Sequence, residues 1–249
     1  MSLLDDRGNS EFPICRAWAE SATLPGVDTG TVCAITMRLA DAEMDETALM
    51  DALRTGMDRH VPDAATRALW LGRFGRIAGE FAEQEAMRRA DGRPAAIEEF
   101  ARWRVPGTGF TLRARADRID LRGDGVAIYD YKTGAVPSIR QQDAYAKQLM
   151  LEALMVEDGA FGTLGRRPVR SVGYLGIGGK LSVTERAVDD ALRGEVMAGL
   201  VALIGRYSGD APFPARLAYE HLGYSGDYDH LARHGEWDDT CAFTPQAVG

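Results

Sequence analysis

The chain has 249 residues, 45% of them hydrophobic, and a formal net charge of −8. This is enough apolar material for a substantial core, but no stretch is long and apolar enough to span a bilayer, and the first residues lack the segments of a secretion signal. The three cysteines are widely spaced without a CxxC pair, which argues against a disulfide framework and against a zinc or iron–sulfur site. We expect a cytoplasmic protein without a membrane segment.

The first third of the chain is expected to be an irregular segment followed by helices. Residues 1–35 contain Gly, Pro, Ser and Thr without clear periodicity. A helix is expected over Asp41–Asp58, and a longer one after Asp63, which suits an N-cap. That longer helix carries an apolar stripe at core-facing spacing, formed by Trp70, Phe74, Ile77 and Phe81.

The middle of the chain is predicted to form three consecutive strands. Ala95–Val105 and Phe110–Leu121 are the first two, and the second alternates apolar and polar residues. The third strand is rich in β-formers and ends at Lys132. The glycines between the second and third strands favour a tight hairpin.

The hairpin loop decides which residues face each other. Gly123–Gly125 offers two possible two-residue loops. If its first two residues form the loop, Asp117 lies directly opposite Asp130; if its last two do, Asp130 lies opposite Ile119. In both cases the period of two keeps Asp117, Asp130 and Lys132 on one face, whereas a loop of odd length would break this parity.

Facing carboxylates repel each other unless a cation neutralises them, and a hard divalent cation with oxygen ligands is the usual solution. Lys132 is one of only three lysines among 29 basic residues. Where arginine is the default, a lysine indicates that a compact ammonium is needed beside Asp117 and Asp130. The combination predicts metal-assisted phosphodiester chemistry. The alternative is a solvated hairpin face with a simple salt bridge.

The remainder of the chain is predicted to hold a helix, a strand and a helix. A helix over Ser138–Glu157 has a polar face and an apolar face. Val169–Ile177 is an apolar strand, and residues 188–207 form a last amphipathic helix. The polar face of the first of these helices consists of Gln141, Tyr145, Gln148 and Glu152.

The charge is unevenly distributed along the chain. Residues 102–180 hold 13 basic and 8 acidic residues, a net charge of +5, whereas both flanking segments are acidic. A local positive field beside the carboxylates would suit phosphate groups, and an ordinary mixed surface is the alternative. The candidate DNA contacts in this basic third are Arg115, Arg118, Arg140 and Lys147.

Three segments together resemble a known family. Arg115–Asp120, Ile128–Gly134 and the dipeptide Gln148-Leu149 are similar to RecB-like nucleases of the PD-(D/E)XK superfamily, in particular to the C-terminal nuclease domain of AddB double-strand break repair proteins. The tail Gly226–Arg233, with Trp237 after it, also resembles the end of AddB proteins. The resemblance covers residues 60 to 240 approximately.

The resemblance implies an α/β fold with a restriction-endonuclease-like core of a helix, a three-stranded antiparallel meander, a helix and a strand, with extra flanking helices. We expect this nuclease domain over residues 36–240 and a C-terminal tail over residues 241–249. It further implies a Mg²⁺- or Mn²⁺-dependent DNA nuclease, expected to be an exonuclease, that acts in double-strand break repair beside an AddA-like helicase–nuclease.

The resemblance also assigns roles to individual residues. Asp117 and Asp130 are implied to be metal ligands, with the backbone carbonyl of Tyr131 as a further ligand. Lys132 is implied to orient or activate the attacking water, and Gln148 matches the glutamine of the family's helical QL motif, which shapes the site. These implied roles agree with the chemistry that the facing carboxylates predict independently.

Two departures from the family pattern leave an alternative open. The family's GTxxH element has its nearest match at Gly30–Ala34, where alanine replaces the ligand histidine. The helicase-like region of AddB proteins and a GxxxxGK[ST] element are both absent, so no ATP site is expected. The alternative is a catalytically weak or inactive nuclease-fold module that binds DNA or docks a partner.

Three further acidic residues are candidates for the surroundings of the site. Glu98 or Glu99, near the start of the first strand, is within reach of the site, but a charged strand edge explains both residues equally well. Asp120 lies on the face opposite to Asp117 if the strand is regular, which favours a structural role.

Overall fold

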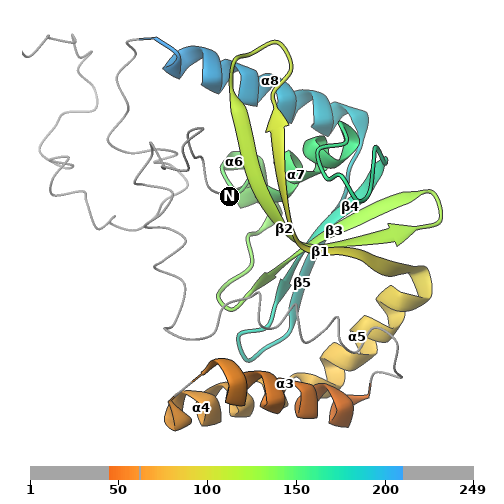
Figure 1. The fold of residues 1–249 in the computed structure, drawn as a ribbon, viewed down its shortest axis with the longest axis vertical. Coiled ribbons are helices and arrows are strands. Elements are labelled where there is room, and N and C mark those ends of the chain that lie inside the picture. Colours follow the sequence, from red (N-terminus) through yellow and green to blue (C-terminus); the bar gives the residue numbers. More distant parts are fainter. Residues whose placement is uncertain (1–44, 62, 210–249) are drawn as a thin grey trace, which may run out of the picture. The chain divides into compact units, whose positions relative to one another are not determined.

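The computed structural model describes residues 45–61 and 63–209. A five-stranded mixed sheet, in the order β1-β2-β3-β4-β5, forms the centre of this part (Figure 1). The first three strands are an antiparallel meander, β4 runs parallel to β3, and β5 pairs antiparallel with β4. The strands are β1 (Gly92–Arg104), β2 (Thr111–Arg122), β3 (Gly125–Lys132), β4 (Val169–Gly176) and β5 (Ser182–Ala187).

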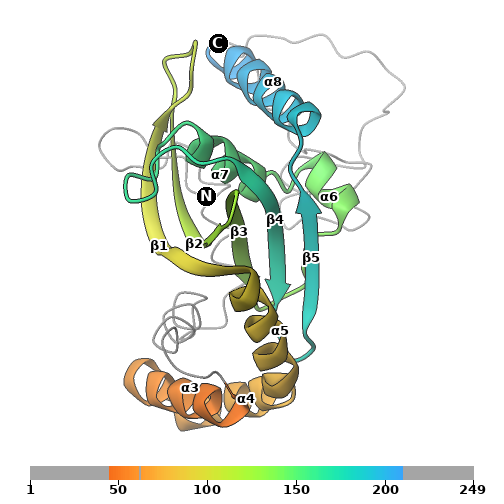
Figure 2. The ribbon, with the colours of Figure 1, turned by 90° about the vertical axis from the view of Figure 1, so that its right-hand side faces the viewer.

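Helices cover both faces of the sheet. In the described part of the chain, three helices precede β1, two connect β3 to β4, and one follows β5. Figure 2 shows how these helices lie around the sheet. One apolar cluster joins the first three helices to one face, and a second joins the last two to the other face. The helices are α3 (Glu46–His60), α4 (Ala64–Gly75), α5 (Ala78–Asp91), α6 (Ile139–Ala144), α7 (Gln148–Glu157) and α8 (Asp190–Tyr207).

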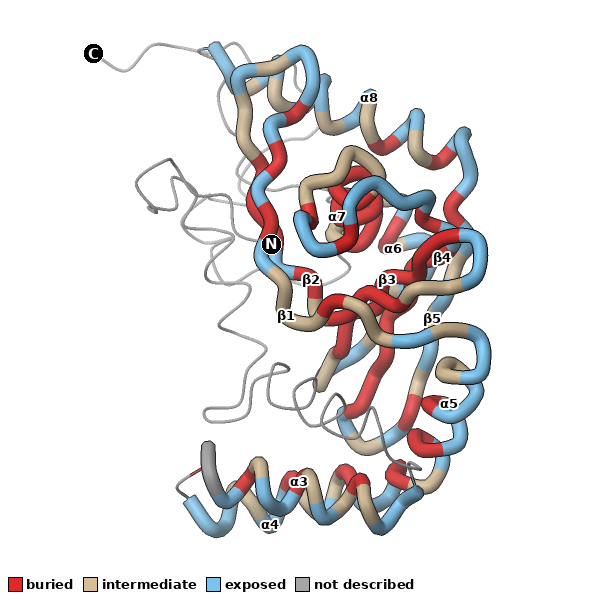
Figure 3. The backbone as a smooth tube through the Cα atoms, turned by 45° about the vertical axis from the view of Figure 1, so that its right-hand side comes forward, coloured by how far each residue is buried: buried red, intermediate tan, exposed pale blue. Residues whose placement is uncertain are grey.

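The core lies around β3 and α7, where buried residues are densest (Figure 3). Residues Gly125–Tyr131 of β3 are all buried, as expected for a central strand covered on both faces. Every residue of α7 from Leu149 to Val156 is also buried. Because β3 and α7 carry four of the predicted site residues, the site is built on the most rigidly packed elements of the fold.

The predicted order of elements is confirmed, with three differences in detail. The helix expected after Asp63 is two helices, because Gly75 ends α4 and Ile77 returns its N–H to Phe74. The helix expected over Ser138–Glu157 is also two, with a non-helical link at residues 145–147. That link separates α7 from α6, and the run of α7 from Leu149 to Val156, apolar except for Glu152, is buried in the core.

The third difference is β5, which the sequence did not predict. Its residues alternate between intermediate and exposed, so no buried apolar run marks it as a strand. It lies at the sheet edge beside β4, away from the hairpin.

The hairpin has the register that places Asp117 toward Asp130. Arg122 pairs with Gly125, so Gly123 and Asp124 form the two-residue loop. Counted from the hairpin loop, the last residue of β2 that pairs with β3 is Arg118, and the next residue along β2 is Asp117. The two strands therefore separate at the level of Asp117 and Asp130, the two predicted metal ligands.

The pairing of β1 with β2 is interrupted at the same level. Glu98 and Asp117 stand opposite each other without pairing, between ladder pairs on either side. Glu98 has φ 49°, in the left-handed region that residues other than glycine rarely adopt. Ala116 packs against the α7 side while Arg118 bonds Glu85 of α5, so the alternation of β2 breaks at Asp117.

The chain divides into two compact units, Met1–Ile204 and Gly205–Gly249, and the second is described only for residues 205–209. The irregular segment 1–35, the Gly30–Ala34 element and the AddB-like tail all lie outside the described residues. Within the described part, no helix combines the length and apolar character needed to cross a membrane.

Candidate functional site

Asp117 occupies the gap where β2 leaves β3. Its Oδ2 accepts a hydrogen bond of 3.0 Å from the backbone N–H of Tyr131. In a continuous sheet that N–H would pair with the backbone of β2, so the Asp117 carboxylate takes the place of the departing strand. The carboxylate is thereby held within one residue of Asp130 on the neighbouring strand.

Asp130 and Lys132 face the same side of β3, two residues apart. The ammonium of Lys132 lies 2.8 Å from Oδ2 of Asp130, and the Asp130 carboxylate is almost completely buried. The same ammonium lies 5.6 Å from the centre of the Tyr174 ring on β4, within the range of a cation–π contact. The lysine is thus held between a carboxylate and an aromatic face.

Gln148, the first residue of α7, links Asp130 to a third carboxylate. Its Nε2 donates to Oδ1 of Asp130 at 2.9 Å and to Oε1 of Glu152 at 3.2 Å. Glu152 is 1% exposed, and its other oxygen, Oε2, has no hydrogen-bond partner among the residues that the structure describes. A buried carboxylate that is only half satisfied is costly, so its presence beside the site needs a reason.

Burial and mutual repulsion disfavour negative charge at this cluster. Burial, reinforced by the charge of Asp130, raises the pKa of Asp117 to about 7. Burial also raises the pKa of Asp130, even though Lys132 and Gln148 act in the opposite direction. Burial, again with Asp130, raises the pKa of Glu152 to about 8. One ammonium does not neutralise three carboxylates, which is the electrostatic signature of a site for a further cation.

Glu152 lies beside the site although the sequence did not single it out. The single helix expected over Ser138–Glu157 places Glu152 on a polar face with Gln141 and Tyr145, but the break between α6 and α7 means that α7 does not continue that face. The signal that identifies it is its isolation, because Glu152 is the only charged residue between Gln148 and Val156. An acidic residue in an otherwise apolar helical run is seldom there for solvation alone.

The other acidic residues separate into a near group and a remote one. Glu98 is close enough to contribute to the raised pKa of Asp117. Glu99 instead bonds the hydroxyl and the N–H of Thr163. Asp120 is buried on the opposite face, where it pairs with Arg118, in agreement with the structural role expected from alternation.

Of the four predicted DNA contacts, the one at Arg118 is wrong, because this side chain is not at the surface. Its side chain is fully buried, and its guanidinium bonds Glu85, Asp120 and the hydroxyl of Tyr131. Because Arg118 lies on the face opposite to Asp130 and is enclosed by α5, its guanidinium is not available to a phosphate. Arg118 forms a buried ion pair with Glu85, and this pair links β2 to α5.

The other three predicted contacts lie nearer the surface. Arg115 is exposed and pairs with Glu98 at 2.9 Å. Arg140 is exposed on α6. Lys147 directly precedes Gln148 and stands 3.8 Å from Glu195 of α8. A role of these side chains in DNA binding remains a prediction.

The donor set suits a cation that completes its own shell. No three Asp, Glu, His or Cys side chains in the described ranges gather closely enough to hold a metal by themselves. Mg²⁺ is usually held by one or two carboxylates, with waters and substrate phosphates as its other ligands. Asp117 and Asp130, short of positive charge and separated by a strand gap, fit this mode of binding.

Comparison with known proteins decides the family. Residues 26–217 match the model of the PD-(D/E)XK nuclease superfamily. The chain belongs to this superfamily. A search of curated proteins finds no match. Members of the PD-(D/E)XK superfamily are generally nucleases and typically use divalent metals, and the α/β fold predicted from the sequence is confirmed.

Within the PD-(D/E)XK superfamily, the name describes an acidic residue followed, on the next strand, by a second acidic residue and a lysine two positions later. Asp117 on β2 and the Asp130-Tyr131-Lys132 run on β3 have this arrangement. The structure brings together these three side chains and Gln148, and it adds Glu152 and Glu98 to their surroundings.

Proposed function

We propose that the chain is a Mg²⁺- or Mn²⁺-dependent deoxyribonuclease that hydrolyses phosphodiester bonds at Asp117, Asp130 and Lys132. The observation that carries the proposal is the 2.8 Å contact of Lys132 with a buried Asp130 that also stands beside Asp117. The excess of negative charge there favours a divalent cation, and the superfamily supplies the reaction class.

In this proposal each side chain has a distinct task. The carboxylates of Asp117 and Asp130 would hold the cation, and the carbonyl of Tyr131 would be a further ligand. When bound, the cation lowers the pKa of an attacking water and neutralises charge on the scissile phosphate. Lys132 places its ammonium beside the same phosphate and stabilises the charge that develops in the transition state.

Gln148 has a positioning role in the proposed reaction. By donating to Oδ1 of Asp130, its amide fixes the rotation of that carboxylate and leaves Oδ2 directed toward Lys132. An amide is suited to this task because it adds no charge to a cluster that is already crowded with carboxylates. Glu152 accepts a hydrogen bond from the same Nε2 and so holds the amide of Gln148 in position.

The finer assignment rests on sequence resemblance. We propose a RecB-like, AddB-type nuclease that acts as an exonuclease on DNA ends in double-strand break repair, beside an AddA-like helicase–nuclease. The segments Arg115–Asp120 and Ile128–Gly134 support this assignment, because they match that subfamily more fully than a D-x-K signal alone would.

The test is cleavage of linear single- and double-stranded DNA with Mg²⁺, with Mn²⁺ and with EDTA. We expect metal-dependent cleavage by the natural protein and its loss in Asp130→Ala and Lys132→Ala. Matched controls are Asp124→Ala in the hairpin loop and Lys180→Ala after β4, both exposed, which should cleave normally. Equal cleavage by all variants would remove the site from consideration.

A non-catalytic nuclease-fold module is the second candidate. The observation in its favour is that no three Asp, Glu, His or Cys side chains of the described residues gather closely enough to hold a metal. DNA binding without cleavage under either metal would establish this second reading in place of the first.

A further inference from the structure

The outer part of the β1–β2 pair is a two-stranded ribbon. It comprises residues 99–104 and 111–116, which pair with each other, whereas β3 pairs with β2 only from Arg118 onward. In Figure 2 this ribbon continues beyond the ends of β3 and β4. Its end nearest the sheet is the level of Glu98 and Asp117, where the strands separate.

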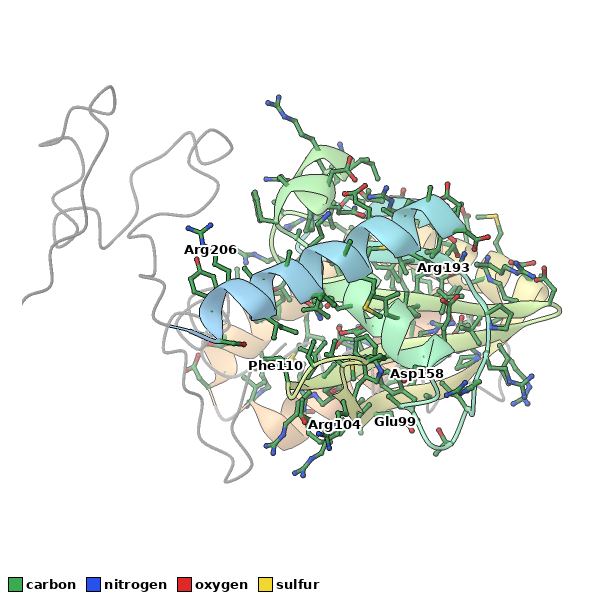
Figure 4. All side chains as sticks on the ribbon, turned by 90° about the horizontal axis from the view of Figure 1, so that it is seen from above. Glu99, Arg104, Phe110, Asp158, Arg193 and Arg206 are labelled. Atoms are coloured by element: carbon green, nitrogen blue, oxygen red, sulfur yellow. The ribbon has the colours of Figure 1, made fainter. Side chains whose placement is uncertain are left out.

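The two faces of the ribbon differ in chemistry. The inner face is buried in the cluster that includes α7 and α8, and its members are Ala101, Trp103, Leu112 and Ala114. The outer face alternates with it and is basic and aromatic. We call its exposed members the ribbon surface: Phe100, Arg102, Arg104 and Arg115. Figure 4 shows Arg104 projecting from the ribbon on the side away from α8.

The ribbon surface is short of partners within the described part of the chain. Phe100 is 53% exposed, which is unusual for a large aromatic side chain. The guanidinium of Arg102 lies 5.9 Å from the centre of the Phe100 ring, and neither Arg102 nor Arg104 has an ion pair in that part. Arg113, opposite Arg102, is buried and is not counted in the surface.

The arrangement matches what unpaired nucleic acid requires. Arginines at alternate positions along a strand can meet successive phosphates, and an exposed ring beside them can stack on a base. Cross-strand register places Phe100 directly opposite Arg115. A base can stack on Phe100 only if it is unpaired, so the exposed ring favours a single strand over a duplex.

We propose that the ribbon surface binds single-stranded DNA and guides it to the cluster at Asp117. This inference rests on the proposed nuclease function and names the substrate form that the site takes. The path ends at Arg115 and Glu98, which pair with each other, and Glu98 acts electrostatically on Asp117. A strand lying along the ribbon surface therefore comes within two residues of Asp117 at its near end, where the pairing of β1 with β2 is interrupted and β2 leaves β3.

The inference is tested by binding, separately from cleavage. Fluorescence anisotropy of a labelled single-stranded oligonucleotide is measured in EDTA for the natural full-length protein, for R102E/R104E and for Phe100→Ala. The matched control is R166E/R170E, because Arg166 and Arg170 are also exposed and the double variant changes the net charge equally.

R102E/R104E should weaken binding at least tenfold and should reduce the slope of log K against log salt by about 1.4, or about 0.7 for each lost phosphate contact. Phe100→Ala should weaken single-strand binding about fivefold to 100-fold and leave duplex binding unchanged. The control R166E/R170E should keep most of the affinity. An equal loss in the control, unchanged binding in the ribbon variants, or no binding by the natural protein would overturn the inference.

A small diester distinguishes this inference from the proposed function. Bis(4-nitrophenyl) phosphate needs no contact with the ribbon, so R102E/R104E should hydrolyse it at the natural rate in Mn²⁺. Failure of the natural protein to hydrolyse both this diester and DNA would contradict the nuclease proposal, while the anisotropy result would still decide the ribbon surface.

Discussion

The ammonium of Lys132 lies 2.8 Å from Oδ2 of Asp130, a carboxylate that is 3% exposed. Both residues belong to β3, a central strand, so their spacing is set by the backbone and not by flexible loops. The other oxygen of Asp130 accepts from Gln148, and Asp117 stands across the strand gap. The charge of each of these groups therefore depends on the charges of the others.

Asp130→Asn should abolish measurable Mn²⁺ binding. The substitution keeps the shape of the side chain but removes one of the two carboxylates that we propose as ligands, and charged oxygen ligands dominate affinity for hard cations. Titration calorimetry on full-length protein provides the measurement, with Asp124→Asn as the control. Unaltered Mn²⁺ affinity in Asp130→Asn would place the cation elsewhere.

Glu152→Gln and Glu152→Met should separate hydrogen bonding from charge. Glu152→Gln retains an acceptor for Gln148 and should cleave within a few-fold of the natural rate. Glu152→Met removes the acceptor, so Gln148 holds Asp130 less firmly and cleavage should fall about fivefold to tenfold, equivalent to about 1 kcal/mol for one hydrogen bond. Natural cleavage rates in Glu152→Met, with an unchanged melting temperature, would show that Glu152 has no positioning role.

The metal-free protein should become less stable as the pH rises from about 4 to about 8. In the unfolded chain Asp117 and Glu152 lose their protons near their ordinary pKa values of 3.8 and 4.5, whereas folding raises these pKa values to about 7 and about 8. Across this window the folded state binds more protons than the unfolded state, so a rise in pH favours unfolding.

Thermal melts in EDTA measure this effect. The melting temperature of the natural protein should be higher at about pH 5 than at about pH 8. The double variant D117N/E152Q cannot ionise at these positions and should have a flatter profile. A natural profile that rises across this range, or a double variant with the same slope, would be inconsistent with carboxylates held protonated by burial.

Arg118→Met should destabilise the protein by about 3–5 kcal/mol, because it leaves Asp120 buried without its partner and removes one of the three arginines that bind the buried Glu85. Burial alone would raise the pKa of Glu85, but Arg118 and the neighbouring arginines outweigh it and lower that pKa. Urea denaturation measures the loss, with the exposed Arg115→Met as the control. A loss no larger than that of the control would show that the ion pair is not needed for stability.

The parts of the site that could be predicted from the sequence are those that depend on interactions between residues close together in the chain. The facing of Asp117, Asp130 and Lys132 was predictable because a two-residue loop and the period of two act locally. The hydrogen bond from Gln148 to Asp130 joins β3 to α7, so only a resemblance, and no pattern in the residues, pointed to Gln148.

The parts that were missed depend on long-range packing. Arg118 was expected at the surface, but α5 brings Glu85 against it from 33 positions earlier in the chain. The ladder interruption at Glu98 has no sequence marker, because its left-handed backbone is carried by a glutamate and not by a glycine. Glu152 was placed on the wrong face because the non-helical link at residues 145–147 was not foreseen.

The central claim is that Lys132 and the carboxylate pair form a nuclease site, and single-turnover cleavage of end-labelled DNA in Mg²⁺ tests it most directly. Lys132→Met should reduce the rate at least about 100-fold, the range for loss of a group that stabilises transition-state charge. It should leave DNA binding and Mn²⁺ affinity close to natural values. Cleavage by Lys132→Met at the natural rate, with metal and DNA bound normally, would contradict the account.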